Sequence, residues 1–285
     1  MQRRLFLSLF LGAILPLGTA KSATNDAGVV VPREVISLFN GRDLSAFYSW
    51  LVDYHREDPL RVFSVVDCVD GAPAIRISGQ IFGGLYTRQQ FAHYKLVAEF
   101  RWGLATWGSR TNAAKDSGVL LHCTGRDGNY FSKTFNGPWM RGYEFQIIQG
   151  GVGDLLVLGG YEPDGSVIQC AATVTTIKDR DGETVWASNG KAEEFQSGRI
   201  NWWGRDVGWD DRLGFRGRQD VESPDREWTR IETICADDTL DYYVNGQRVN
   251  YASRLSHKAG RLIFQSEGAE IFFRKIELHP LPAAK

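Results

Sequence analysis

The sequence predicts an all-β protein, folded as a jelly-roll β-sandwich that carries a long loop insert. Apolar and polar residues alternate in short runs along the chain, and no segment keeps a long 3.6-residue period. The 285 residues also include 31 Gly, 16 Phe, 10 Tyr and 9 Trp, a composition that favours strands joined by tight turns.

Nine runs of about five to nine residues are rich in Val, Ile, Phe and Tyr and are bounded by Gly, Asp or Asn. The strands they predict are, in chain order, Ala74–Ser78, Tyr94–Arg101, Gly118–Cys123, Tyr143–Gln149, Asp154–Leu158, Trp228–Ile234, Thr239–Val244, Arg261–Gln265 and Ile271–Leu278. Asn245-Gly246 is typical of a type I′ hairpin turn. Many short strands at such spacing are typical of a sandwich.

Residues 179–227 interrupt this rhythm, because they are rich in glycine and hold Trp186, Trp202, Trp203 and Trp209. An insert of roughly 45 residues with little regular pattern is usually functional or disordered, and the tryptophans argue against disorder. We expect loops at the mouth of a site. The alternative is an insertion that covers a sheet edge.

The N-terminus reads as an export signal. Residues 1–20 combine Arg3 and Arg4 with an apolar run and small residues up to Ala20, and the arginine pair resembles a bacterial twin-arginine signal. Residues 21–31 are expected to be a leader, and 32–282 a single jelly-roll catalytic domain. The predicted location is the periplasm or the exterior, with no membrane attachment once the signal is removed.

The charge balance narrows the class of partner. Lys and Arg total 33 against 34 Asp and Glu, so the protein is not expected to bind nucleic acid through bulk charge. Nucleophile elbows, phosphate-binding loops, zinc-protease motifs and dinucleotide fingerprints are absent from the sequence. The many aromatic residues are compatible with a carbohydrate-facing surface.

Polar pairs on three predicted strands suggest one site. Period-two alternation puts Glu144 beside Gln146, Gln265 beside Glu267, and Glu99 beside Arg101 on their strand faces. If these faces line one side of the sandwich, they offer the carboxylates, amides and guanidinium that bind sugars. Alternatively, each pair belongs to a water-facing strand surface.

Two further residues leave two interpretations each, and a third has one expected role. His122 shares the alternation of Gly118 and Leu120, and is either a structural histidine or a site residue. Asp154 is either a turn residue or a site residue. Arg274 is expected to pair with a carboxylate as a structural lock.

Motifs in order along residues 36–280 resemble the 3-keto-disaccharide hydrolase domain family. They include Ile36–Leu44, Asp116–His122, Tyr143–Gln149 and Phe264–Gly268. The resemblance implies a concanavalin/laminarin-like jelly roll and cleavage of glycosides whose sugar carries a ketone at C3. That ketone acidifies the C2 proton, so a base can remove it, the C1 substituent leaves by β-elimination, and water adds to the product.

Such a reaction needs a base, an acid, and a donor or cation at the C3 oxygen. We assign the acid and base roles to Glu144, His122 and Glu267 without deciding which is the base. Sugar or enolate binding is assigned to Gln146, Gln265, Arg101, Arg141, Trp139 and Asp154, with Trp139 as the stacking platform.

The resemblance leaves other points open. A divalent ion could polarise the C3 oxygen, and no cofactor is otherwise expected. An oxidoreductase that forms the 3-keto sugar is the expected pathway partner. The alternatives are a non-catalytic carbohydrate-binding module and an ordinary glycoside hydrolase that acts on unoxidised glucan.

Overall fold

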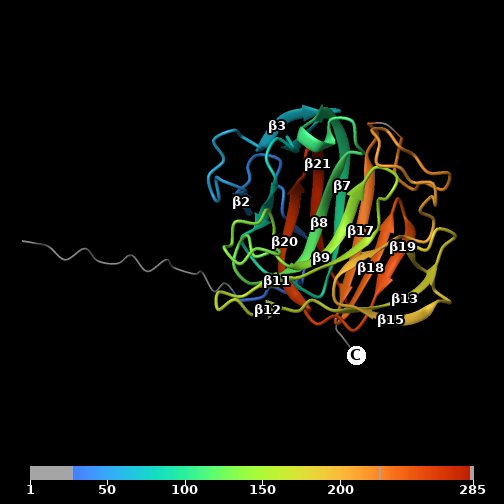
Figure 1. The fold of residues 1–285 in the computed structure, drawn as a ribbon. Coiled ribbons are helices and arrows are strands. Elements are labelled where there is room, and N and C mark those ends of the chain that lie inside the picture. Colours follow the sequence, from blue (N-terminus) through green and yellow to red (C-terminus); the bar gives the residue numbers. More distant parts are fainter. Residues whose placement is uncertain (1–27, 225, 283–285) are drawn as a thin grey trace, which may run out of the picture.

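Two antiparallel sheets face each other across the core in the computed structural model, which describes residues 28–224 and 226–282 (Figure 1). Sheet I has the order β19 (Gln247–Ala252), β18 (Thr239–Val244), β17 (Thr229–Ala236), β7 (Tyr94–Thr106), β21 (Ala269–Pro280), β4 (Ala72–Ile77) and β3 (Phe63–Val69), with β1 (Ile36–Ser37) beside β21. Sheet II has the order β16 (Gly198–Ile200), β10 (Leu155–Leu158), β9 (Gly142–Ile148), β8 (Asp116–Cys123), β20 (Ala259–Ser266), β5 (Gly83–Thr87) and β2 (Phe47–Leu51), with β6 (Phe91–Ala92) beside β20.

Smaller elements decorate the sandwich. A two-stranded sheet pairs β11 (Gly160–Tyr161) with β12 (Val167–Ile168). A three-stranded sheet sets β13 (Ala172–Lys178) between β14 (Thr184–Trp186) and β15 (Lys191–Phe195). One short 3₁₀ helix, η1 (Gly108–Arg110), follows β7. The predicted all-β sandwich is confirmed, and each of the nine predicted strands overlaps an observed one.

Period-two alternation builds the main core. On β9, Tyr143, Phe145 and Ile147 point between the sheets and are fully buried. Phe264 of sheet II packs edge-on against Phe273 of sheet I, with the ring centroids 5.2 Å apart. Because these side chains fix the inner face of sheet II, the intervening residues of β8, β9 and β20 occupy its outer face.

The insert contains more strand than expected. Within 179–227 the chain forms β14, β15 and β16, and residues 201–224 and 226–228 then run mainly as loops. β16 pairs with β10 and so extends the edge of sheet II. Trp186 and Trp202 are buried in the main core. The insert therefore both covers a sheet edge, which was the alternative interpretation, and supplies loops beside it.

Arg274 forms the expected lock. Its Nε donates to Glu99 Oε2 at 2.6 Å across β21 and β7. The predicted signal at 1–20 and most of the predicted leader lie outside the described residues. The division into signal, leader and a single domain stays a prediction. No helix within 28–224 or 226–282 has the length and apolar character needed to cross a membrane.

Removing a ring from the contact between the sheets should destabilise the whole sandwich. Phe264→Ala should lower the free energy of unfolding by about 3–5 kcal/mol, because the cavity sits between two rigid sheets. The matched Phe272→Ala, at a half-buried position on the outer face of sheet I, should cost about 1 kcal/mol or less. Urea denaturation of both variants measures this, and equal losses would contradict the assignment of the core.

Candidate active site

The outer face of sheet II is enclosed as well as the inner face. Leu120 and Ile263 pack there with Trp139 and Met140, which come from the segment between β8 and β9. Four polar side chains on or beside the same face are consequently buried at 3% exposure or less: Asp116, Glu144, Gln146 and Gln265. Buried polar groups normally need partners, so this cluster must be either internally satisfied or prepared for a ligand.

Gly118 allows two of these side chains to meet. A Cβ at this position would lie 2.5 Å from Glu144 Oε1 and 2.4 Å from Gln265 Oε1, so any other residue would force these side-chain ends to move. The carboxyl of Glu144 and the amide of Gln265 therefore lie over the bare backbone of β8. Neither Nε2 nor Oε1 of Gln265 has a hydrogen-bond partner in the described part of the chain. This amide is available to a bound molecule.

Asp116 anchors a polar chain at the start of β8. Its Oδ1 accepts from Gln146 Nε2 at 2.5 Å, and its Oδ2 accepts from Arg110, the last residue of η1. Arg110 also donates to Asp211 Oδ1 at 2.9 Å, which ties the insert to this face. The loop that carries Arg110 packs closely, since a Cβ at Gly268 would lie 2.8 Å from Arg110 Cγ. Gly268 directly follows Glu267, so Glu267 lies beside the polar chain that contains Asp116 and Arg110.

Burial, together with neighbouring carboxylate charges, raises the proton affinity of three carboxyl groups. Burial, and then the charge of Asp116, raise the pKa of Glu144 to about 8, against the opposing charge of Arg199. Burial and the charges of Asp116 and Glu144 raise the pKa of Glu267 well above its usual range. Burial also raises the pKa of Asp116 to about 6, although Arg110 and Arg199 oppose this. The cluster thus retains protons near neutral pH and titrates as a unit.

Asp154 organises the arginines beside the cluster. It is fully buried, and its Oδ2 accepts from Arg199 Nη1 at 3.0 Å and from Arg205. Its Oδ1 accepts from the backbone N–H of Trp202 at 2.9 Å. Arg199 in turn donates to Gln146 Oε1 at 3.3 Å. Asp154 therefore acts through the arginines, and we reassign it from sugar binding to positioning.

Aromatic rings form a row beside the carboxyl groups. The ring of Trp139 lies 5.6 Å from that of Tyr130 and 6.3 Å from that of Phe82, and Phe131 lies 4.8 Å beyond Tyr130. Trp139 is held by an Nε1 bond to Gly83 O at 2.7 Å and is only 8% exposed. Tyr130 is within electrostatic reach of Glu144 and Glu267, whose charges add to burial in raising the Tyr130 pKa to about 12. Phe82 and Phe131 are exposed, so these two rings are the most accessible part of the row.

The structure separates His122 from the carboxyl cluster. β8 carries an extra residue opposite Arg261–Ile263, and His122 takes a positive φ of 53°. This bulge turns the ring inward, edge-on to Tyr94 and Tyr143 of the main core. Its Nδ1 lies 3.2 Å from His257 O, and burial lowers its pKa to about 4. We therefore remove His122 from the acid and base candidates.

Arg101 and Arg141 also lie apart from the carboxyl cluster. Arg101 belongs to β7 of sheet I, where it pairs with Asp70 and lies over the Trp228 ring. Arg141 shares the alternation of the inward-facing Tyr143 and donates to Thr124 Oγ1. Neither side chain contacts Glu144 or Gln265, so the expected sugar-binding role fails for both.

Sequence reasoning missed several members of the site. Asp116, Arg110, Arg199, Arg205 and Tyr130 all interact with the cluster. Asp116 carried a signal, since it has the same alternation as Gly118 on one strand. The arginines and Tyr130 lie in η1, β16 and loops. The local sequence pattern does not predict that these segments lie close to β9.

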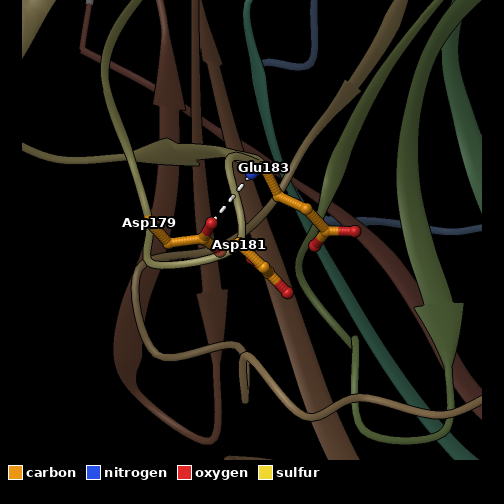
Figure 2. A group of neighbouring side chains, drawn as sticks. All are labelled: Asp179, Asp181 and Glu183. Carbon is orange, nitrogen blue, oxygen red and sulfur yellow. Dashed lines mark hydrogen bonds between the residues drawn. The ribbon is translucent and has the colours of Figure 1, made fainter.

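One group of three carboxylates has ligand atoms within 4.8 Å of one another in residues 28–224 and 226–282. It consists of Asp179, Asp181 and Glu183 on the turn between β13 and β14 (Figure 2). Asp179 Oδ1 accepts from the Glu183 N–H at 2.8 Å, and Glu183 Oε2 accepts from Asn201 at 2.6 Å. These two hydrogen bonds stabilise the turn between β13 and β14. A divalent ion in the candidate site stays a prediction.

The family assignment comes from a match over most of the chain. Residues 34–279 match the model of the 3-keto-alpha-glucoside-1,2-lyase-like domain. The chain belongs to this family. The predicted resemblance is thereby confirmed. Membership identifies a glycosidase-like domain, for which a carbohydrate is the expected class of substrate.

Solved structures with low sequence identity share parts of this architecture. Two proteins from Parabacteroides distasonis ATCC 8503, provisionally described as glycosyl hydrolases, match with 14% and 16% identity and TM-scores of 0.48 and 0.45. Each alignment covers 87% of this chain. It covers 94% of the first Parabacteroides protein and 100% of the second. A Bacillus licheniformis β-glucanase matches with 9% identity and a TM-score of 0.41, over 87% of this chain and 99% of its own. No curated protein matches the sequence.

The raised pKa of Glu144 makes a prediction about stability. Between about pH 4.5 and 8 the unfolded chain loses a proton that the folded chain keeps, so folding stability should fall as pH rises. In Glu144→Gln the carboxyl is absent, so the variant does not lose stability in this way as the pH rises. The variant should exceed the wild type by on the order of 1 kcal/mol or more at about pH 8, and should match it near pH 4.

Chemical denaturation across this pH range measures the difference. Glu57→Gln, at an exposed position before β3, is the control and should follow the wild type throughout. A Glu144→Gln variant whose stability relative to the wild type is the same at both ends of the range would show that Glu144 is ionised normally.

Proposed function

We propose that the protein cleaves the glycosidic bond of 3-keto-glycosides by removing the C2 proton, expelling the C1 substituent and hydrating the product. The observation that carries this proposal is the buried Glu144 beside Asp116 and the half-buried Glu267, with the proton affinities of the two glutamates raised toward or above neutral pH. A carboxylate with a raised pKa is a stronger base, and a carboxyl that keeps its proton is an acid. The family description supports the same substrate class.

Glu144 is proposed as the base. Its carboxylate takes the C2 proton, the C–H electron pair moves toward the C3 ketone, and an enolate oxygen develops there. The unpartnered Nε2 of Gln265 and the guanidinium of Arg199 are the donors beside Glu144 that stabilise this charge. Such donors, held ready in a water-poor site, contribute about 3–4 kcal/mol each to a developing oxyanion.

Glu267 is proposed as the acid. As the enolate collapses to a C1=C2 double bond, the C1–O bond breaks and Glu267 gives its proton to the leaving oxygen. Water then adds across the double bond, with hydroxyl at C1 and hydrogen at C2. The aromatic row of Trp139, Tyr130, Phe82 and Phe131 provides apolar ring faces for sugar C–H groups.

A turnover assay tests the proposal. The full chain is incubated with the 4-nitrophenyl α-glycoside of 3-keto-glucose and, in parallel, with the unoxidised α-glucoside, with and without a chelator. We expect nitrophenol from the keto form only. Release from both would instead support ordinary glycoside hydrolysis, and release from neither, with sugar binding by calorimetry, a binding module. Chelator sensitivity decides the metal question.

Substitution of the two carboxyls should remove activity without unfolding the protein. Glu144→Gln and Glu267→Gln should each lower kcat by about 10²–10⁴-fold, since each removes a positioned proton transfer. Glu57→Gln is the control and should keep wild-type kcat, because it lies on the exposed β2–β3 connection. Wild-type kcat in either site variant would eliminate that residue from the mechanism.

The pH profile should report the same groups. The base form of Glu144 grows as pH rises through its raised pKa of about 8, so kcat/KM should climb to an apparent pKa near that value. It should fall at higher pH, where Glu267 loses its proton. Asp116→Asn removes one negative charge and should move the rising limb to lower pH. A rising limb centred near pH 4–5 and unmoved by Asp116→Asn would contradict the assignment of Glu144 as base.

We also propose that the protein works outside the cytoplasm, as the sequence of residues 1–20 indicates. Its substrate must come from an oxidoreductase that converts the C3 hydroxyl of a glycoside into a ketone. Fractionation of cells that produce the full chain tests the location, and cytoplasmic protein of full length would contradict it.

A further inference from the structure

A cavity lies in the insert, beside the arginines of the candidate site. Its volume is about 360 Å³. The side chains that define it are Arg180, Trp203, Arg205, Asp206, Arg218 and Gln219. Glycines complete the lining. A Cβ at Gly204 would lie 2.3 Å from the Trp202 ring, so this part of the wall carries no side chain. The space suits one sugar-sized ring at the lower end of common ligand pockets.

The charge of this pocket is unbalanced. Arg180 and Arg218 are exposed and form no ion pair with the described residues. The one carboxylate of the lining, Asp206, is occupied by its own loop: its Oδ1 accepts from the Gly208 N–H at 2.9 Å and its Oδ2 from the Arg218 N–H at 3.1 Å. Arg180 and Arg218 therefore face a single carboxylate that is already engaged, while Arg205 is paired with Asp154. A bound anion would complete the arrangement, because guanidinium forks match carboxylates in two-bond geometry.

Arg205 joins the pocket to the candidate site. Its guanidinium donates to Asp154, which holds Arg199 at 3.0 Å and thereby the Gln146–Asp116 pair. Its Nε is buried without a partner in the described part of the chain, and its side chain lies over the Trp209 ring at 4.4 Å. Arg205 therefore lies between the pocket and the groups of the candidate site.

Trp203 gives the pocket an apolar wall. Its Nε1 donates to Arg248 O at 2.8 Å, which fixes the ring plane, and the residue is 40% exposed. An immobile, exposed indole beside arginines is suited to a ring that carries a negative charge.

We propose that this pocket binds a carboxylate-bearing ring, and that this ring is the leaving-group unit of the substrate. The inference rests on the proposed function for the identity of the leaving group, whereas the binding of the carboxylate stands without it. The protein would then act on 3-keto-glycosides of acidic aglycones, such as hydroxybenzoates or uronic acids. The neutral keto-sugar ring would lie over the carboxyl cluster and the aromatic row, and the acidic ring over Trp203.

Paired substrates and binding assays on the full chain test this. The substrates are 3-keto-α-glucosides of 4-hydroxybenzoate, 4-hydroxybenzamide and 4-hydroxybenzenesulfonate. The binding probes, measured by calorimetry, are free 4-hydroxybenzoate and glucuronate. The variants are Arg218→Gln and Arg180→Gln, with Arg42→Gln as a control at an exposed arginine between β1 and β2.

We expect the wild type to favour the benzoate over the benzamide in kcat/KM, and this ratio to fall by about tenfold or more in Arg218→Gln, the effect of one lost charge-assisted bond. Carboxylate binding should weaken in parallel, and Arg42→Gln should show neither change. Equal use of the sulfonate would overturn the assignment to a carboxylate. Turnover without preference or binding would overturn the pocket and leave the function standing. Arg218-dependent binding without any turnover would support the pocket and overturn the function.

Discussion

Burial of neighbouring carboxyl groups is the constraint on which the candidate site depends. Asp116, Glu144 and the half-buried Glu267 lie on or beside the outer face of sheet II, where burial favours their protonated forms and the charge of Asp116 adds to this for both glutamates. Such a cluster destabilises the folded state unless cations and packing oppose it. Arg110 and Arg199 provide that opposition from η1 and β16. The result is a set of acids whose proton affinities fall in the range useful for catalysis.

The rest of the fold explains how these groups are held. The inward residues of β9 and β20 lock the central strands against sheet I, so their outward residues have fixed positions. Gly118 leaves room for two of them to converge. The insert then contributes what the central strands lack: β16 brings Arg199, and the following loop brings Arg205 and Asp211. The insert therefore supplies side chains to the candidate site as well as a cover for the sheet edge.

Local pattern predicts the strands and the faces of regular ones, but not which strands meet. Glu144, Gln146 and Gln265 were found because uninterrupted alternation determines their face. His122 was misassigned because one extra residue in β8 reverses the alternation, and nothing in the sequence marks that bulge. Arg101 was misassigned because its strand joins the other sheet. Arg199 lies on a three-residue strand, too short to carry a periodic signal. The local pattern therefore predicted the fold and the shared outer face of Glu144, Gln146 and Gln265, while their role in a site stays a proposal.

The central claim is that a buried carboxylate removes the proton at C2. The fate of the C2 hydrogen tests this most directly. The reaction is run in deuterium oxide with a 3-keto-α-glucoside, and the released sugar is examined by mass spectrometry and NMR, with an enzyme-free control for spontaneous exchange. The account predicts one solvent deuterium at C2 of the released 3-keto-glucose. A product that keeps its original C2 hydrogen would contradict it and indicate direct displacement at C1.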